Sequence, residues 1–145
     1  MIALDTNLLV YAHREDSPHH AVALRLLREV ATGRAPWGIP WPCLHEFLAI
    51  ITHPRIYSPP TAVPVAVEAM RSLLHLPHAQ VLTETADHGD ILRDLLLASP
   101  GVAGARVHDA RVAAICLSHG VRELWSADRD FSWFPALRVV NPLVG

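Results

Sequence analysis

The chain has 145 residues, 51% of them hydrophobic and 18% charged, which predicts one folded domain over residues 1–145. Its net charge of −2 excludes binding of nucleic acid along a broad basic face, although all twelve basic residues are arginines, which suit phosphate well. Pro, His and Gly interrupt the uncharged stretches and an acid interrupts the first apolar run, so we expect neither a membrane span nor a signal peptide.

Apolar periodicity and turn residues predict the elements of the amino-terminal half. In chain order these are a buried parallel strand in the run 2–10 ending near Asp5, a helix over 18–32 ended by Gly33, a short strand over 37–40, a helix over 42–53 and a proline-rich loop over 54–64. Pro42 fits the first turn of its helix, where a missing N–H costs nothing.

The same signals predict the elements of the carboxy-terminal half. In chain order these are a helix over 64–75, a strand at 81–82, a helix over 86–98, a loop over 99–105, a helix over 106–119 closed by Gly120, and strands over 123–127 and 137–140. Alternating strands and helices indicate an α/β fold with a mainly parallel sheet. Right-handed crossovers should then place helices on both faces of that sheet.

Two acids follow predicted strands. Asp5 ends the first apolar run, and Asp128 comes directly after the run ELWSA. Functional groups of open parallel sheets gather at the carboxyl ends of the strands, so these two carboxylates are expected to lie near each other. Asp is also common in turns after strands, so either residue alone could have only a turn or cap role.

Two further acids lie on predicted helices at unusual positions. Glu46 falls at the margin of an apolar arc, beside Cys43 and Ile50, and Asp109 falls between Ala113 and Cys116. An isolated carboxylate at such a position would be partly desolvated. The alternatives are a plain surface role for Glu46 and, for Asp109, a first-turn acid favoured by the helix dipole.

Four carboxylates in one cleft would repel one another unless cations bind among them. A ligand set of oxygens only favours Mg²⁺ or Mn²⁺ over zinc, and such ions serve phosphodiester hydrolysis. The ten histidines show no HExxH pattern, and the sequence has neither a glycine-rich phosphate loop nor GxSxG. A phosphatase of the haloacid-dehalogenase type would need a second Asp at position 7, which is Asn7. Cys43 and Cys116 lie in apolar stretches without CxxC spacing, which favours reduced, buried thiols and a cytoplasmic protein.

At the level of motifs the sequence resembles the PIN-domain family, and within it the VapC toxins of bacterial toxin–antitoxin pairs. The segments that carry the resemblance are LDTNLLVYA (4–12), PCLHEFLAI (42–50), VHDARVAAICLSHGVREL (107–124) and WSADRDFSWF (125–134). They occur in the order of the family and together span nearly the whole chain. The first motif alone is weak, but the four in order are specific.

The resemblance implies a three-layer α/β/α sandwich and a metal-dependent endoribonuclease acting on RNA, usually dimeric, with a cognate VapB-type antitoxin. The four acids of the family match Asp5, Glu46, Asp109 and Asp128, and the metal is most often assigned to the first and third. Three further positions also match: Asp130 matches an acid often present two residues after the fourth, with a less certain role, and Asn7 and Ser126 match small polar residues that commonly orient the acids.

Three interpretations of the function remain open from the sequence. The leading one is a toxin ribonuclease, the second a housekeeping PIN ribonuclease of RNA processing, and the third an interaction module that binds without cleaving. The small size favours the toxin, and the intact acid set argues against the non-cleaving module. For a toxin we expect the antitoxin to place an apolar segment along a groove beside residues 42–53 and a basic side chain at the acids. Exposed apolar surface for this contact is suggested by four tryptophans: Trp37, Trp41, Trp125 and Trp133.

Overall fold

The centre of the fold is a sheet of five short parallel strands in a computed structural model that describes residues 1–144. In sheet order the strands are β3 (Ala79–Leu82), β2 (Trp37–Pro40), β1 (Ile2–Leu4), β4 (Glu123–Trp125) and β5 (Val139–Val140). All four pairings are parallel, so the prediction of a mainly parallel sheet is confirmed.

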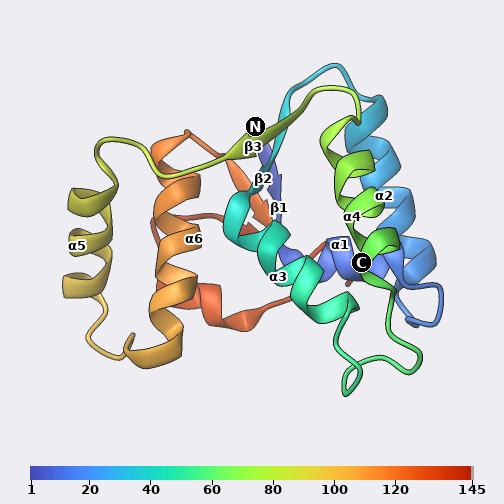
Figure 1. Ribbon diagram of the computed structural model, residues 1–145. Helices are drawn as coiled ribbons and strands as arrows, with labels where there is room; N and C mark the ends of the chain where they lie inside the picture. The colour runs from blue at the N-terminus through green and yellow to red at the C-terminus, as the bar shows by residue number, and fades with distance from the viewer. Residues whose placement is uncertain (145) are drawn as a thin grey trace.

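Within residues 1–144, six α-helices flank the sheet, and the chain also forms two short 3₁₀ helices. The helices are α1 (Thr6–His13), α2 (His20–Thr32), α3 (Trp41–Ile51), α4 (Val63–Leu74), α5 (His88–Ala98) and α6 (Val107–Ser118), with η1 (Gly104–Arg106) and η2 (Arg129–Trp133). The pair α5 and α6 lies on one side of the sheet, and α2 and α4 lie on the other (Figure 1). The predicted three-layer α/β/α architecture is thus confirmed.

Helix α1 was not predicted, although the strand predicted to end near Asp5 is confirmed, because the apolar residues after Asp5 were assigned to no helix. The strand ends at Leu4, and α1 begins at Thr6, directly after Asp5. Most of the first half of α1 is buried, including Leu8, Leu9 and Val10. A short helix that is buried almost all round has no clear period of 3.6 in its hydrophobicity, so its residues look like those of a buried strand.

The other predicted elements exist, with ends that differ by a few residues. The strands predicted over 123–127 and 137–140 are shorter, at Glu123–Trp125 and Val139–Val140. A 3₁₀ turn occupies the end of the segment predicted as a loop over 99–105, and η2 follows β4 without having been predicted. These short turns bend the chain at the places where it enters and leaves the candidate site.

The order of the strands decides where a site can form. The chain moves from β1 to β2 and β3 on one side, then returns to place β4 and β5 on the other side of β1. The connections therefore diverge at β1 and β4, and this leaves a crevice at their carboxyl ends. Asp5 follows β1 and Ser126 follows β4, so both lie at this crevice.

Not all of the tryptophans are on the surface. Trp37 is completely buried in the core, and its indole nitrogen donates to the carbonyl of Pro77 at 2.9 Å, so the expectation of exposed apolar surface is wrong for this residue. Trp133 is 39% exposed. Both cysteines are free and buried, as the sequence predicted. No helix within residues 1–144 is long and apolar enough to cross a membrane.

Candidate metal centre

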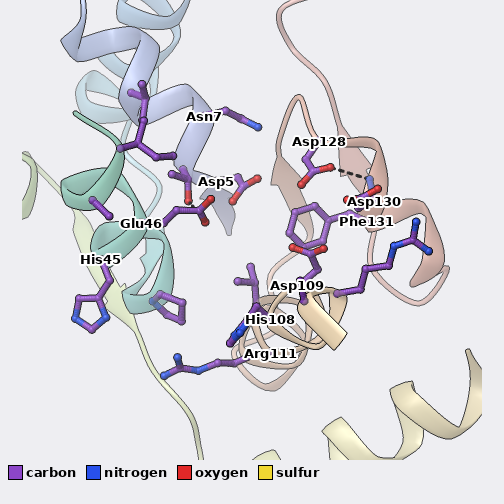
Figure 2. A pocket seen from close by; sticks show the side chains of 18 of the residues that line it. Asp5, Asn7, His45, Glu46, His108, Asp109, Arg111, Asp128, Asp130 and Phe131 are labelled. Atoms are coloured by element: carbon purple, nitrogen blue, oxygen red, sulfur yellow. Dashed lines mark hydrogen bonds between the residues drawn. The ribbon is translucent and has the colours of Figure 1, made fainter. Parts of the chain in front are cut away.

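An open cleft of about 840 Å³ lies at the carboxyl ends of the strands. Five acids line it, and we call them the acidic cluster: Asp5, Glu46, Asp109, Asp128 and Asp130. Figure 2 shows their side chains directed toward a common space from α3, α6, the end of β1 and the segment after β4. The structure therefore brings together all four acids selected from the sequence, together with Asp130.

Asp5 forms the buried floor of the cleft. The Ser126 hydroxyl donates to Oδ2 of Asp5 at 2.6 Å, and the Cys43 thiol donates to Oδ1 at 3.3 Å. Burial raises the pKa of Asp5, and these hydrogen bonds act in the opposite direction by favouring the ionised form. Burial also raises the pKa of Cys43 well above its ordinary value, so the thiol keeps its proton and can donate it.

Short polar bonds position Asp128 after β4. The Ser126 hydroxyl accepts from the backbone N–H of Asp128 at 2.9 Å, and Asn7 accepts from the N–H of Ala127 at 3.2 Å. Asp128 is also the N-cap of η2, where its Oδ1 accepts from the N–H of Asp130 at 2.8 Å (Figure 2). Asn7 and Ser126 thus orient the acids, as the resemblance implied, although Asn7 does so through the backbone.

Glu46 reaches the cleft from α3. The Thr6 hydroxyl lies 3.2 Å from its Oε2 and 3.4 Å from the carbonyl of Cys43, so it links the start of α1 to α3. Partial burial raises the pKa of Glu46, and the charge of Asp5 raises it further. Glu46 is therefore open to solvent on the cleft side but coupled to the cluster, which argues against a plain surface role.

Asp109 is the acid most affected by its neighbours. It lies in the first turn of α6, where the helix dipole would favour its charge. Its pKa is nevertheless raised to about 6, first by burial and then by the charges of all four other cluster acids. Repulsion and desolvation therefore outweigh the dipole, so the alternative of a simple first-turn acid does not account for Asp109.

The donor chemistry of the cluster fits a divalent cation. One carboxylate oxygen each from Asp109, Asp128 and Asp130 lies within 4.8 Å of the other two. A set of ionised oxygens suits Mg²⁺ or Mn²⁺, and a cation among them would relieve the repulsion that raises the pKa of Asp109. The predicted metal ligands were Asp5, Glu46, Asp109 and Asp128, with Asp5 and Asp109 favoured by the resemblance, and the role of Asp130 was open. In the structure Asp130 belongs to the group of three acids within 4.8 Å of one another, and Asp5, outside that group, accepts hydrogen bonds from Ser126 and Cys43.

Two residues of the site were not identified from the sequence. Cys43 was interpreted as a buried thiol of no further role, and Thr6, directly after the predicted end of the first strand, was given no role. Both contact cluster acids, Cys43 at Asp5 and Thr6 at Glu46. The available signal was their position: Thr6 follows Asp5 directly, and Cys43 precedes Glu46 by about one helical turn, on the same face of α3.

Comparison with known proteins agrees with this geometry. The family model described as "PIN domain" matches residues 2–136. Ribonuclease VapC43 from Mycobacterium tuberculosis is 36% identical over 145 residues, which is 100% of this chain and 97% of that protein.

Solved structures share the fold over nearly the whole chain. FitAcB from Neisseria gonorrhoeae superposes with a TM-score of 0.71 at 19% identity and 100% coverage of both chains. A chain of a toxin–antitoxin complex from Klebsiella pneumoniae gives a TM-score of 0.61 at 17% identity, covering 98% of each chain. From the family model and the full-length relative, the chain belongs to the PIN-domain family and, within it, to the VapC ribonucleases of VapBC toxin–antitoxin systems.

Proposed function

We propose that this VapC ribonuclease is a magnesium-dependent endoribonuclease whose metal is bound by the acidic cluster, with Mn²⁺ as a substitute. The observation that carries the proposal is the convergence of Asp109, Asp128 and Asp130 within 4.8 Å at the topological switch point of the sheet. Mg²⁺ bound there would supply an activated water and stabilise the leaving oxygen of a phosphodiester.

The acids of the cluster have different proposed roles at this site. Asp109, Asp128 and Asp130 offer oxygens from two separate segments, so they would hold the cation. Asp5 and Glu46 complete the negative charge around it from β1 and α3, and Asp5 is fixed in place by Ser126 and Cys43. Asp5, Glu46, Asp109 and Asp128 are thus the proposed catalytic and metal-binding residues, with Asp130 added by the structure.

The test is cleavage of RNA by the purified chain in titrations of Mg²⁺ and of a chelator. Activity should require the cation, and Asp5→Asn and Asp109→Asn should each lose most of the rate because each removes a charged oxygen. Asp90→Asn is the matched control, since Asp90 lies in the first turn of α5 and outside the cleft. Undiminished cleavage in excess chelator would refute metal dependence.

We also propose that a VapB-type antitoxin inhibits this chain, which itself acts as a homodimer. The cleft supports the first part, because α3 lines it with Ala49 and Ile50 beside Glu46 and the exposed Ile56 extends the apolar wall. An apolar segment along α3 and a basic side chain at the acids would be favoured there, since the cleft is partly desolvated.

The antitoxin proposal is tested by neutralising the basic residues of the partner one at a time and measuring residual ribonuclease activity in the complex. Relief of inhibition by one such change is expected. If only truncation of apolar residues relieves it, the partner acts by steric cover alone. Light scattering of the purified toxin tests the dimer.

A further inference from the structure

We propose that Arg106 and Arg111 bind RNA phosphates on the two flanks of the acidic cluster and so form a clamp for the backbone of the substrate. The inference deepens the proposed ribonuclease function and rests on it, because it assigns the residues that hold the strand across the cleft. These two are the arginines that line the cleft.

Neither arginine forms a salt bridge with a residue of the acidic cluster. Among residues 1–144, Arg111 forms its salt bridge with Glu84, and Arg106 forms none. The acidic cluster is thus left to a cation, and both guanidinium groups keep donors that can bind an anion. A cleft lined by five acids repels a polyanion, and cationic side chains beside these acids reduce that repulsion.

Arg111 is positioned by Glu84. Its Nε and Nη2 both contact Oε1 of Glu84, which also accepts from the Thr83 hydroxyl through Oε2. Backbone and Arg111 hydrogen bonds lower the pKa of Glu84 to about 2, so the anchor stays charged. The Arg111 side chain is still 41% exposed. Because one edge of the planar guanidinium is fixed, its other edge can bind a phosphate with a smaller loss of side-chain entropy.

Arg106 is positioned by Trp133. Its guanidinium carbon lies 5.3 Å from the centroid of the indole ring. The ring in turn packs over Gly101, where a Cβ atom would come within 2.8 Å of the indole, and the carbonyl of Trp133 accepts from the Ser99 hydroxyl at 2.9 Å. The indole is thus fixed by the loop before α6, and the cation–π contact orients Arg106 without cancelling its charge.

The two anchors lie on opposite flanks of the cluster. Glu84 follows β3, at one edge of the sheet, whereas Trp133 lies between β4 and β5, which form the other edge. Asp5 follows the central strand between them. In Figure 2, Arg111 lies on the side of Asp109 away from Asp130. A strand that crosses the cleft between the two arginines therefore passes over the acidic cluster.

The experiment measures binding of a short fluorescein-labelled single-stranded RNA of mixed sequence by anisotropy. The protein carries Asp109→Asn so that the RNA is not cut, and the salt concentration is varied. Arg106→Gln and Arg111→Gln should each weaken binding about tenfold at low salt, the loss of one charge-assisted contact. Each should also reduce the slope of log affinity against log salt by about 0.7, the value for one phosphate contact of a single strand.

Arg93→Gln is the matched control. Arg93 forms salt bridges with Asp90 and Asp94 on α5 and does not line the cleft, so the same charge is removed from an acid-paired arginine elsewhere. Its affinity should change by no more than about twofold. Slopes for the Arg106 and Arg111 variants equal to that of Arg93→Gln would overturn the clamp. Arg106→Lys and Arg111→Lys guard against misfolding, since they should keep the salt slope while binding more weakly.

Two further measurements test the clamp separately from the proposed ribonuclease function and from the role of Trp133. If the chain with native acids cuts no RNA with Mg²⁺ while the slopes change as expected, the clamp stands and the proposed function fails. Trp133→Leu tests the anchor, because its effect on affinity should vanish when Arg106→Gln is already present. Additive losses would show that Trp133 does not act through Arg106.

Discussion

The hydroxyl of Ser126 donates a hydrogen bond of 2.6 Å to Oδ2 of Asp5 and joins the ends of β4 and β1 across 121 positions of sequence. The Ser126 Oγ also accepts from the backbone N–H of Asp128 at 2.9 Å. One buried serine therefore sets the relative positions of two acids of the cluster. The hydrogen bond from Ser126 also stabilises the buried carboxylate of Asp5 at the base of the cleft.

Ser126→Ala should lower both activity and stability. The change leaves the buried carboxylate of Asp5 without its shortest hydrogen bond, so the free energy of unfolding should fall by about 2 kcal/mol. The rate of RNA cleavage should fall about tenfold, because Asp5 and Asp128 lose a common anchor. Urea unfolding and initial rates measure the two effects. Ser118→Ala is the control, since Ser118 only donates to the carbonyl of Ile115 within α6; an equal loss of rate in both variants would refute the role of Ser126.

Cys43→Ala should impair the site, whereas Cys116→Ala should affect stability alone. Both thiols are completely buried, so each truncation removes comparable packing and should cost on the order of 1 kcal/mol. Only Cys43 donates to Asp5. Its loss should raise the pKa of Asp5 further, because a donor to the charged form is removed. The apparent Mg²⁺ requirement of cleavage, compared between the two variants, measures this; identical requirements would mean that the thiol is only a packing residue.

The metal-free protein should lose stability as pH rises from about 4 to about 6. The pKa of Asp109 is about 6 in the folded chain and near its ordinary value of 3.8 in the unfolded chain. The folded state therefore binds the proton more strongly, and its advantage is complete below the unfolded pKa and lost as pH rises through the folded pKa. Asp5 and Glu46 shift in the same direction and add to the effect.

Asp109→Asn should flatten this pH dependence, as measured by urea unfolding at a series of pH values with chelator present. Asp90→Asn, on an exposed first turn, should leave it unchanged. With Mg²⁺ present the sign is reversed, because protons compete with the cation and its stabilising effect should decline below about pH 6. If the free energy of unfolding of Asp109→Asn depends on pH as that of the unmodified chain does, Asp109 is not the group that causes this dependence.

Asp130→Asn should weaken metal binding. The measurement tests the role of Asp130, which the sequence left open. Its carboxylate is one of the three that lie within 4.8 Å of one another, while its contact with Asp128 is made by the backbone N–H. The substitution therefore removes a charged ligand and leaves the backbone turn in place. Calorimetric titration with Mn²⁺ should show about tenfold weaker binding. Unchanged affinity would limit the ligands to the four acids predicted from the sequence.

The sequence by itself determined the fold class and the acids. Alternating strand and helix patterns are local properties, and in the described part of the chain, residues 1–144, they located every strand of the sheet and five of the six α-helices. The four motifs in order identified Asp5, Glu46, Asp109 and Asp128, and all four line one cleft. Helix α1 was the exception, because Thr6, Leu8, Leu9 and Val10 are buried with no clear periodicity, and burial on several sides comes from tertiary packing.

Only the tertiary structure decided which atoms meet. The strand order β3-β2-β1-β4-β5 places the ends of β1 and β4 side by side, and no local pattern encodes that neighbourhood. From it follow the bond of Ser126 to Asp5 and the close group that includes Asp130. The raised pKa of Asp109 has the same origin, since burial and charge repulsion depend on distances through space rather than along the chain. The anchors of Arg106 and Arg111 likewise come from segments remote in sequence, Trp133 and Glu84, so their orientation required the folded chain.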